Sequence, residues 1–231
     1  MRCRVVALDA LTHDIKAVRL VIEAGGPFTF SAGQYAQVEF GPGMSKHYSM
    51  ASTPSEPEIE FQIRHMPSGR ASAYVAHQLK VEDIVKVSGP LGSSYLREQH
   101  AGPVLLLAGG SGFAPMQSIL CTLLGRNYPE RVTLYFGVRS ERDLYHEGLL
   151  KDLAVKHPSF SYHIVLSEQK GERGRRYGLV HEAAAEDLKD VSGYKAYLAG
   201  PPVMVESATA MLEARGMAHR DIHADAFYNQ P

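Results

Sequence analysis

The segment 104–115 constrains the fold of this chain more than any other. An apolar run at 104–108 leads into the glycine-rich stretch 109–112, and Pro115 stands where a helix would begin. A buried strand followed by a glycine turn and a helix start is typical of sites where backbone N–H groups receive a phosphate. The turn alone leaves two interpretations open, a nucleotide site and an ordinary tight turn.

The chain from residue 99 onward alternates apolar runs with helix-like stretches. The apolar runs cover residues 104–108, 132–137, 162–166 and 195–199, and the helix-like stretches cover 115–124, 143–156, 179–188 and 202–215. This alternation predicts βαβ units and a Rossmann-like, doubly wound parallel sheet. The polar, basic segment 169–176 is expected to be an exposed loop.

Residues 1–98 follow a different pattern. Short strand-like runs, several of them alternating apolar with polar residues, are separated by turns that contain glycine and proline. The runs cover residues 3–8, 16–22, 35–40, 47–51, 58–64 and 84–87, with one expected helix at 71–79. Such spacing predicts an antiparallel β-barrel or sandwich. We therefore expect two domains, a β domain at 1–98 and an α/β domain at 99–231.

Composition argues against several classes of protein. The net charge of the 231 residues is −1, from 24 basic and 25 acidic side chains, so a nucleic-acid partner is not expected. Cys3 and Cys121 are too few for a disulfide framework or an iron–sulfur cluster. Because the sequence has neither an apolar run of about 18–20 residues nor a signal-peptide pattern, we expect a cytoplasmic protein with no membrane partner.

Two other kinds of chemistry also find little support. Ser111 follows Gly109 by two residues, but Phe113 occupies the position where a nucleophile elbow needs glycine, so a catalytic serine is not expected. His181 has no second histidine four residues later, and the pair His219 and His223 lies in an expected loop. We therefore expect no metal site.

The β half carries two motifs that suit a flavin. The sequence Lys-His-Tyr-Ser at 46–49 places an aromatic ring beside a cation and a hydroxyl, which suits a flat heterocycle with a phosphate tail. An ordinary strand with Tyr48 in the core would have the same sequence. The stretch 69–72 precedes the expected helix, whose N-terminus could bind pyrophosphate with Arg70, or could be a plain helix start capped by Ser68 or Ser72.

The second strand of the α/β half is followed by Arg139, Ser140 and Arg142. An acid near this point often holds the ribose 2′-OH of NAD, whereas an arginine can hold the 2′-phosphate of NADP. The two arginines therefore either favour tolerance of NADPH or are solvated side chains at a helix start that Asp143 caps. The residues leave both interpretations open.

Together these motifs resemble those of the ferredoxin–NADP reductase superfamily, and the resemblance covers essentially the whole chain. Stretch 46–52 is similar to the flavin motif, 69–72 to the pyrophosphate motif, 109–116 and 197–204 to the two nicotinamide motifs, and 225–228 to the terminal aromatic segment. Segments 88–96, 135–140 and 223–228 are especially similar to reductase components of bacterial aromatic-ring-hydroxylating dioxygenases. Many of those also carry an iron–sulfur domain, so we expect a naturally short form similar to NAD(P)H:flavin reductases, or a fragment.

The resemblance implies a flavin-dependent NAD(P)H oxidoreductase, with FAD in the β domain and NADH or NADPH in the α/β domain. Hydride would pass from NAD(P)H to FAD, and electrons would then pass to an iron–sulfur ferredoxin or oxygenase component. Two alternatives stay open. The chain could release free reduced flavin, or it could be a flavin-binding conduit or regulatory module that does not oxidise NAD(P)H.

The resemblance also implies the site residues. The catalytic residues would be Ser49, Asp225 and Phe227. The cofactor-binding residues would be Lys46, His47, Tyr48, Ser49, Arg64, Gly69, Arg70, Ala71, Ser72, Gly110, Ser111, Gly112, Pro115, Arg139, Ser140, Gly200, Pro201, Met204 and Tyr228. Two residues depart from the family pattern. Lys46 stands where arginine is usual, which predicts a weaker grip on phosphate, and Ala199 stands where many relatives have cysteine.

Overall fold

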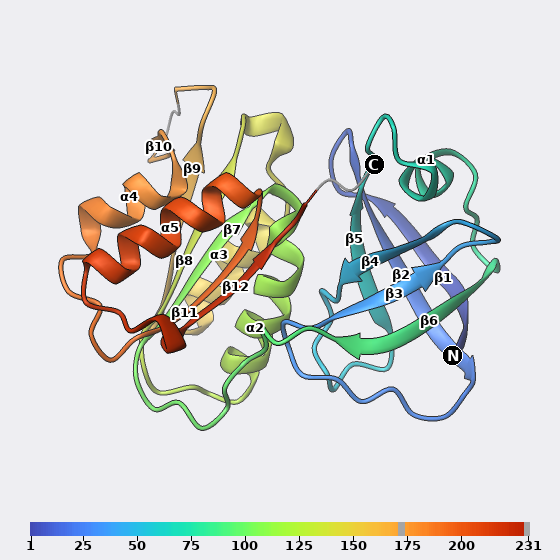
Figure 1. Cartoon of the computed structure of the whole chain (residues 1–231), viewed down its shortest axis with the longest axis horizontal. Coiled ribbons are helices and arrows are strands. Elements are labelled where there is room, and N and C mark those ends of the chain that lie inside the picture. Colours follow the sequence, from blue (N-terminus) through green and yellow to red (C-terminus); the bar gives the residue numbers. More distant parts are fainter. Residues whose placement is uncertain (171–173, 229–231) are drawn as a thin grey trace.

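The computed structural model describes residues 1–170 and 174–228, which it divides between two six-stranded sheets (Figure 1). The first sheet uses strands up to Leu91, and the second begins at Val104. The expected domain boundary at residues 98–99 falls in the segment between them and stays a prediction. Among the described residues, no helix combines the length and the apolar character that crossing a membrane requires.

The first sheet is antiparallel and closes on itself. Its strands lie in the order β4-β3-β6-β1-β2-β5, and a bridge between Met50 and Phe61 joins the two edges. Closure pairs the edge strands, so the predicted β-barrel is confirmed. The elements are β1 (Arg2–Ala10), β2 (Ile15–Ala24), β3 (Tyr35–Glu39), β4 (Ser45–Ser49), β5 (Ile59–Arg64), α1 (Arg70–His77) and β6 (Ile84–Leu91).

Strand β5 shows how the sequence pattern builds this barrel. Phe61 and Ile63 belong to the barrel core and are at most 2% exposed. Because side chains alternate along a strand, Glu60, Gln62 and Arg64 lie on the outer face. The α/β domain covers that face, so Gln62 is also buried, with only 4% of its surface exposed. A polar row that an isolated barrel would show to water thus becomes part of the domain interface.

The second sheet is parallel, with strand order β10-β9-β8-β7-β11-β12. The chain moves outward from β7 through β8 and β9 and then returns to the other side of β7. This reversal creates a topological switch point between β7 and β11, where open α/β sheets bind ligands at the carboxyl ends of their strands. The strands are β7 (Val104–Gly109), β8 (Val132–Val138), β9 (Phe160–Leu166), β10 (Arg176–Tyr177), β11 (Lys195–Gly200) and β12 (Ile222–Ala226).

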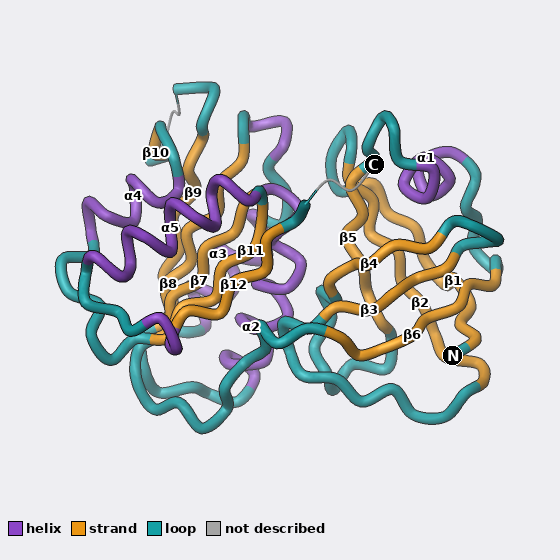
Figure 2. The backbone as a smooth tube through the Cα atoms, viewed as in Figure 1, coloured by secondary structure: helices purple, strands orange, loops and turns teal. Residues whose placement is uncertain are grey.

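Helices cover both faces of the parallel sheet (Figures 1 and 2). Helices α2 (Phe113–Gly125) and α3 (Glu147–Lys156) pack on one face, and α4 (Val180–Asp187) and α5 (Pro202–Ala214) pack on the other. In β7, Leu106 belongs to the core under α2, whereas Leu105 and Leu107 belong to the core under α4 and α5. A strand buried on both faces explains the continuous apolar run. The predicted doubly wound fold is therefore confirmed.

The structure differs from the sequence prediction in two segments. The helix expected at 143–156 begins only at Glu147, because 141–143 form a short 3-10 turn and His146 adopts a left-handed φ of 56°. The end of the expected loop 169–176 enters strand β10, where Arg176 pairs with Val165. A two-residue strand is too short for hydrophobic periodicity to reveal. Residues 171–173 of that loop lie outside the described residues.

Candidate functional site

The ends of β7 and β11 approach each other where two glycines face. Gly200 has a φ of +148°, and a Cβ there would lie 3.0 Å from the Cα and the carbonyl oxygen of Gly109. A Cβ on Gly109 would in turn lie 2.6 Å from the Met204 sulfur, at the start of α5 after Pro201. Side chains at the two glycine positions are therefore excluded, and backbone atoms form this end of the sheet.

The predicted glycine turn lies on this strand end. Residues Gly110–Gly112 form a 3-10 turn that runs into α2, and a Cβ on Gly112 would lie 2.1 Å from the Ala199 carbonyl oxygen. Pro115 is the third residue of α2, where its missing N–H removes no helical bond. Within the described part of the chain, no side chain caps α2 and its first turn has no acid. The turn containing Ser111 thus meets the requirements of a phosphate site.

Strand β4 brings the flavin motif to the barrel's side of the interface. Lys46 and His47 are exposed, and Ser49 is buried. The Tyr48 ring packs edge-on against Phe40 and Phe61, and burial raises the pKa of its hydroxyl to about 12. Tyr48 therefore contributes to barrel packing, as the alternative interpretation of this strand expected.

Ser49 and Asp225 meet across the interface. Ser49 ends β4 and Asp225 lies near the end of β12, and the serine side chain is close enough to affect the titration of the carboxylate. Burial raises the pKa of Asp225, and the nearby Ser49 side chain opposes that shift. The sequence separation of these residues is large, so the fold alone creates a pair that can hold or transfer a proton.

The terminal aromatic segment passes over the end of β11. The Phe227 N–H donates a 2.9 Å hydrogen bond to the Gly200 carbonyl, and the Phe227 ring packs against the α/β core. Tyr228 is 68% exposed. Phe227 is thus fixed at the strand end, next to Asp225 and the two facing glycines.

The start of α1 is open to an anion. Gly69 is the N-cap, and of the residues that the structure describes none caps this helix with its side chain. The buried Ser72 hydroxyl instead bonds to backbone atoms of Met66 and Gly69, which excludes Ser72 as the cap. Arg70, an exposed first-turn residue followed by buried Ala71, adds a positive charge beside the free N–H groups. This set fits a pyrophosphate.

Arg64 reaches the glycine turn from the barrel. Gly110 has a φ of +55°, and a Cβ there would lie 2.9 Å from an Nη atom of Arg64. The Arg64 Nε is buried without a hydrogen-bond acceptor among the described residues, although the Asp14 carboxylate lies 3.3 Å away as an ion pair. The Nη atoms of Arg64, which lie beside Gly110, place a positive charge next to the glycine turn, where an anionic group could bind. Together with the two open helix starts, it fits the phosphates of FAD and a nicotinamide dinucleotide.

Arg139 is engaged by carboxylates. Its Nη2 lies 2.7 Å from the Asp143 carboxylate and 3.7 Å from that of Asp14 in the barrel. Asp143 also accepts hydrogen bonds from the backbone and the hydroxyl of Ser140, which caps the 3-10 turn. Burial alone would raise the pKa of Asp143, but the bonds from Ser140 and Arg139 lower it. Arg142 donates to the His13 ring at 3.2 Å.

The sequence prediction missed a buried polar cluster between the domains. Gln62 donates to Gln117 at 2.9 Å and accepts from the Tyr145 hydroxyl at 3.1 Å. The alternation in β5 marks Gln62 as facing outward, which would have been a usable signal. Nothing local in the sequence shows that a second domain covers that face.

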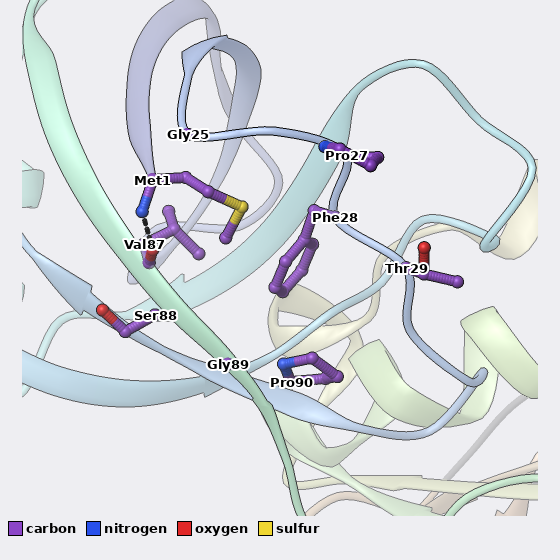
Figure 3. Close-up of a pocket in the computed structure, with 9 residues that line it drawn as sticks. All are labelled: Met1, Gly25, Pro27, Phe28, Thr29, Val87, Ser88, Gly89 and Pro90. Carbon is purple, nitrogen blue, oxygen red and sulfur yellow. Dashed lines mark hydrogen bonds between the residues drawn. The ribbon is translucent and has the colours of Figure 1, made fainter.

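A cavity of about 400 Å³ lies elsewhere, at the edge of the barrel (Figure 3). Figure 3 shows the Phe28 ring and Pro90 among the residues that line the cavity. The Met1 amine, another lining group, donates to the Val87 carbonyl at 2.6 Å. None of its lining residues belongs to the predicted site, and none has a titratable side chain. This cavity therefore plays no part in the site described above.

Comparisons with known families match both halves of the chain. Residues 2–95 match the oxidoreductase FAD-binding domain, and residues 106–210 match the oxidoreductase NAD-binding domain. A ferredoxin–NAD(P)+ reductase component of naphthalene 1,2-dioxygenase/salicylate 5-hydroxylase systems from Ralstonia is 45% identical over 97% of this chain and 68% of its own length. The chain belongs to the ferredoxin–NADP reductase family. The corresponding Pseudomonas putida component of the naphthalene 1,2-dioxygenase system is 42% identical over 97% of this chain and 68% of its own length.

Solved structures agree with this assignment. The Amycolatopsis cytochrome P450 reductase GcoB superposes with a TM-score of 0.91 at 33% identity, over 98% of this reductase and 70% of that chain. A ferredoxin reductase of carbazole 1,9a-dioxygenase gives a TM-score of 0.88 at 30% identity. The superposition covers 99% of this chain and 69% of that one. The predicted family, the enzyme class and the cofactors FAD and NAD(P)H are therefore confirmed.

Proposed function

We propose that this reductase passes electrons from NAD(P)H through FAD to an iron–sulfur ferredoxin or oxygenase component of an aromatic-compound oxygenase system. The meeting of Ser49 with Asp225 carries the proposal, because it joins the flavin motif to the carboxyl end of the nucleotide-binding sheet. The names of the relatives support the choice of acceptor. One NAD(P)H would be oxidised to NAD(P)+ with release of a proton, while two one-electron acceptors are reduced.

The residues of this chain would divide the work as follows. The N–H groups of the Gly110–Gly112 turn, with Arg64, would bind the dinucleotide diphosphate, and the start of α1 with Arg70 would bind the flavin pyrophosphate. The pair of Ser49 and Asp225 would orient the reacting rings and hold a proton. Bound FAD would supply the conversion between a two-electron donor and one-electron acceptors.

We also propose that NADH is preferred to NADPH. A 2′-phosphate near Arg139 would have to displace the carboxylates of Asp143 and Asp14, which already face this guanidinium. Like charges repel that phosphate, whereas a ribose hydroxyl could bond to a carboxylate. The kcat/KM for NADH should exceed that for NADPH by at least about tenfold, which corresponds to about 1.4 kcal/mol. Equal values would overturn the preference and leave the reductase assignment intact.

A cytoplasmic location is proposed on the basis of cysteine usage. Cys3 and Cys121 are both free thiols. Free thiols and the absence of disulfides among the described residues suit a reducing compartment. Fractionation of cells should recover the protein with cytoplasmic enzymes, and recovery with the periplasmic fraction would contradict this location.

The proposed function is tested by anaerobic reduction of the purified protein. We expect a yellow protein whose flavin absorbance is bleached by NADH, and which then reduces two equivalents of an added plant-type [2Fe–2S] ferredoxin. Flavin that passes an ultrafiltration membrane after reduction, without ferredoxin reduction, would instead favour a flavin reductase. Bound flavin that neither nucleotide bleaches would overturn the enzyme assignment.

A further inference from the structure

We infer that Gln62 and Tyr145 form a polar latch that holds the glycine turn in a fixed position relative to the barrel. They would therefore be positioning residues for hydride transfer. The inference rests on the dinucleotide site proposed above. The latch consists of the Gln62 amide, the Tyr145 hydroxyl and the Gly110 carbonyl, with Gln117 and His146 as further partners of the amide.

The Tyr145 hydroxyl connects the two domains at the turn itself. It lies 3.1 Å from the Gln62 Oε1 in the barrel and 3.2 Å from the carbonyl oxygen of Gly110. The tyrosine is 5% exposed, and its ring packs edge-on against Phe113 and Phe136 at centroid distances of 5.6 and 5.5 Å. A ring held on two sides fixes the position of its hydroxyl.

The Gln62 amide ties the barrel to two more segments of the α/β domain. Its Nε2 lies 2.9 Å from the Gln117 Oε1 in α2 and 3.3 Å from the His146 Nε2, which precedes α3. Glu60, on the same strand, accepts at 3.1 Å. Burial lowers the pKa of His146, which keeps its ring neutral and able to accept a hydrogen bond. The amide has two N–H donors for three acceptors, and the Tyr145 hydroxyl has one O–H donor for two, so these bonds are shared among the acceptors. The donors reach these acceptors only when the two domains are arranged as they are here, so the network favours that arrangement.

The latch lies next to the groups that would hold the dinucleotide. Gly110 is the first residue of the phosphate-binding turn, and Arg64 follows Gln62 by two residues on the same face of β5. A sideways shift of the barrel would therefore move the flavin motif relative to the turn. The α/β domain would keep its own contacts with the nucleotide. Hydride transfer is much more sensitive to such a shift than binding is, since a misplacement of about 1 Å can cost about 100-fold in rate.

A second buried bond between the domains provides a matched control. The Ser118 hydroxyl in α2 donates to the Ser52 carbonyl of the barrel at 2.7 Å. This bond joins the same two domains through α2 instead of through the glycine turn. Its removal should cost stability without moving Gly110.

The test compares Tyr145→Phe, Gln62→Leu and the double variant with Ser118→Ala. Tyr145→Phe deletes one oxygen and keeps the aromatic packing, so it serves even where Gln62→Leu fails to fold. We expect each latch variant to lower the single-turnover rate of flavin reduction by NADH at least tenfold, with the Kd for NAD+ changed less than threefold. Because both residues serve one latch, the double variant should be no slower than the slower single variant. Ser118→Ala should keep the parent rate.

Amide hydrogen exchange gives a readout that is independent of turnover. The backbone amide of Phe113, which donates to the Gly110 carbonyl, should exchange at least tenfold faster in the latch variants than in Ser118→Ala, with no nucleotide present. Unchanged exchange and parent-like reduction rates in Tyr145→Phe would overturn the latch. Failure of NADH to reduce the parent protein would overturn the proposed function instead, while the exchange rates would still decide whether the latch exists.

Discussion

Replacement of Gly112 by alanine is expected to destabilise the α/β domain and distort the nucleotide site together. The new Cβ would lie 2.1 Å from the Ala199 oxygen, 2.4 Å from its carbonyl carbon and 2.8 Å from the Gly200 nitrogen. Ordinary van der Waals contact begins at 3.4 Å, so one backbone segment must move by about 1.3 Å. No side-chain rotation can relieve the clash, because all three atoms belong to the β11 backbone.

The expected loss of stability follows from the cost of overpacking a protein interior. Forcing atoms into a packed interior costs about 1–3 kcal/mol, which for a chain of this size lowers the Tm by roughly 2–12 °C. The shift also moves the turn that would bind the diphosphate, so affinity for NAD+ should fall at least about tenfold. Thermal unfolding followed by circular dichroism and calorimetric titration with NAD+ measure the two effects.

Gly125→Ala is the matched control for this substitution. Gly125 is the exposed last residue of α2, and a Cβ there meets nothing within 4 Å. Alanine should be neutral or stabilise the protein by up to about 1 kcal/mol, with NAD+ affinity unchanged. A Gly112→Ala protein with the stability and the affinity of the parent would refute the reasoning from backbone contact.

Three further predictions concern titratable groups. Burial raises the pKa of Asp225 above 3.8, so the folded protein loses stability as the pH rises from 3.8 through the pKa of the folded state. Asp225→Asn should therefore raise the Tm at pH 7, and this gain should vanish below pH 3.8. Asp143→Ala should cost about 1–3 kcal/mol at pH 7 by urea unfolding, and the lowered pKa of Asp143 means that this loss shrinks below pH 3.8. Burial raises the pKa of Cys121 to about 11, so its thiol should resist a disulfide reagent at pH 8 until the protein unfolds, and rapid labelling of the folded protein would contradict this.

Much of the fold follows from local sequence patterns. The alternation in 59–64 predicts which side chains of β5 face the barrel core, and the continuous run 104–108 predicts a strand buried on both faces. The glycine turn is also local, because a strand, a turn and a helix start follow one another along the chain. Such features depend on neighbours a few residues away, so periodicity and turn chemistry are sufficient to predict them.

Residue pairing across the interface could not be predicted in this way. The alternation in β5 is a usable signal that Gln62 faces outward, but only the docking of the α/β domain buries it against Tyr145. The same docking brings Ser49 next to Asp225 and brings Arg139 to within 3.7 Å of the Asp14 carboxylate.

The sequence by itself thus determined most strands of the two sheets, most of the helices and the glycine turn that joins β7 to α2. The tertiary structure decided which polar side chains form ion pairs and hydrogen bonds with one another. The physical reason is that a repeat along the chain fixes the direction of a side chain, whereas its partner depends on how distant segments pack.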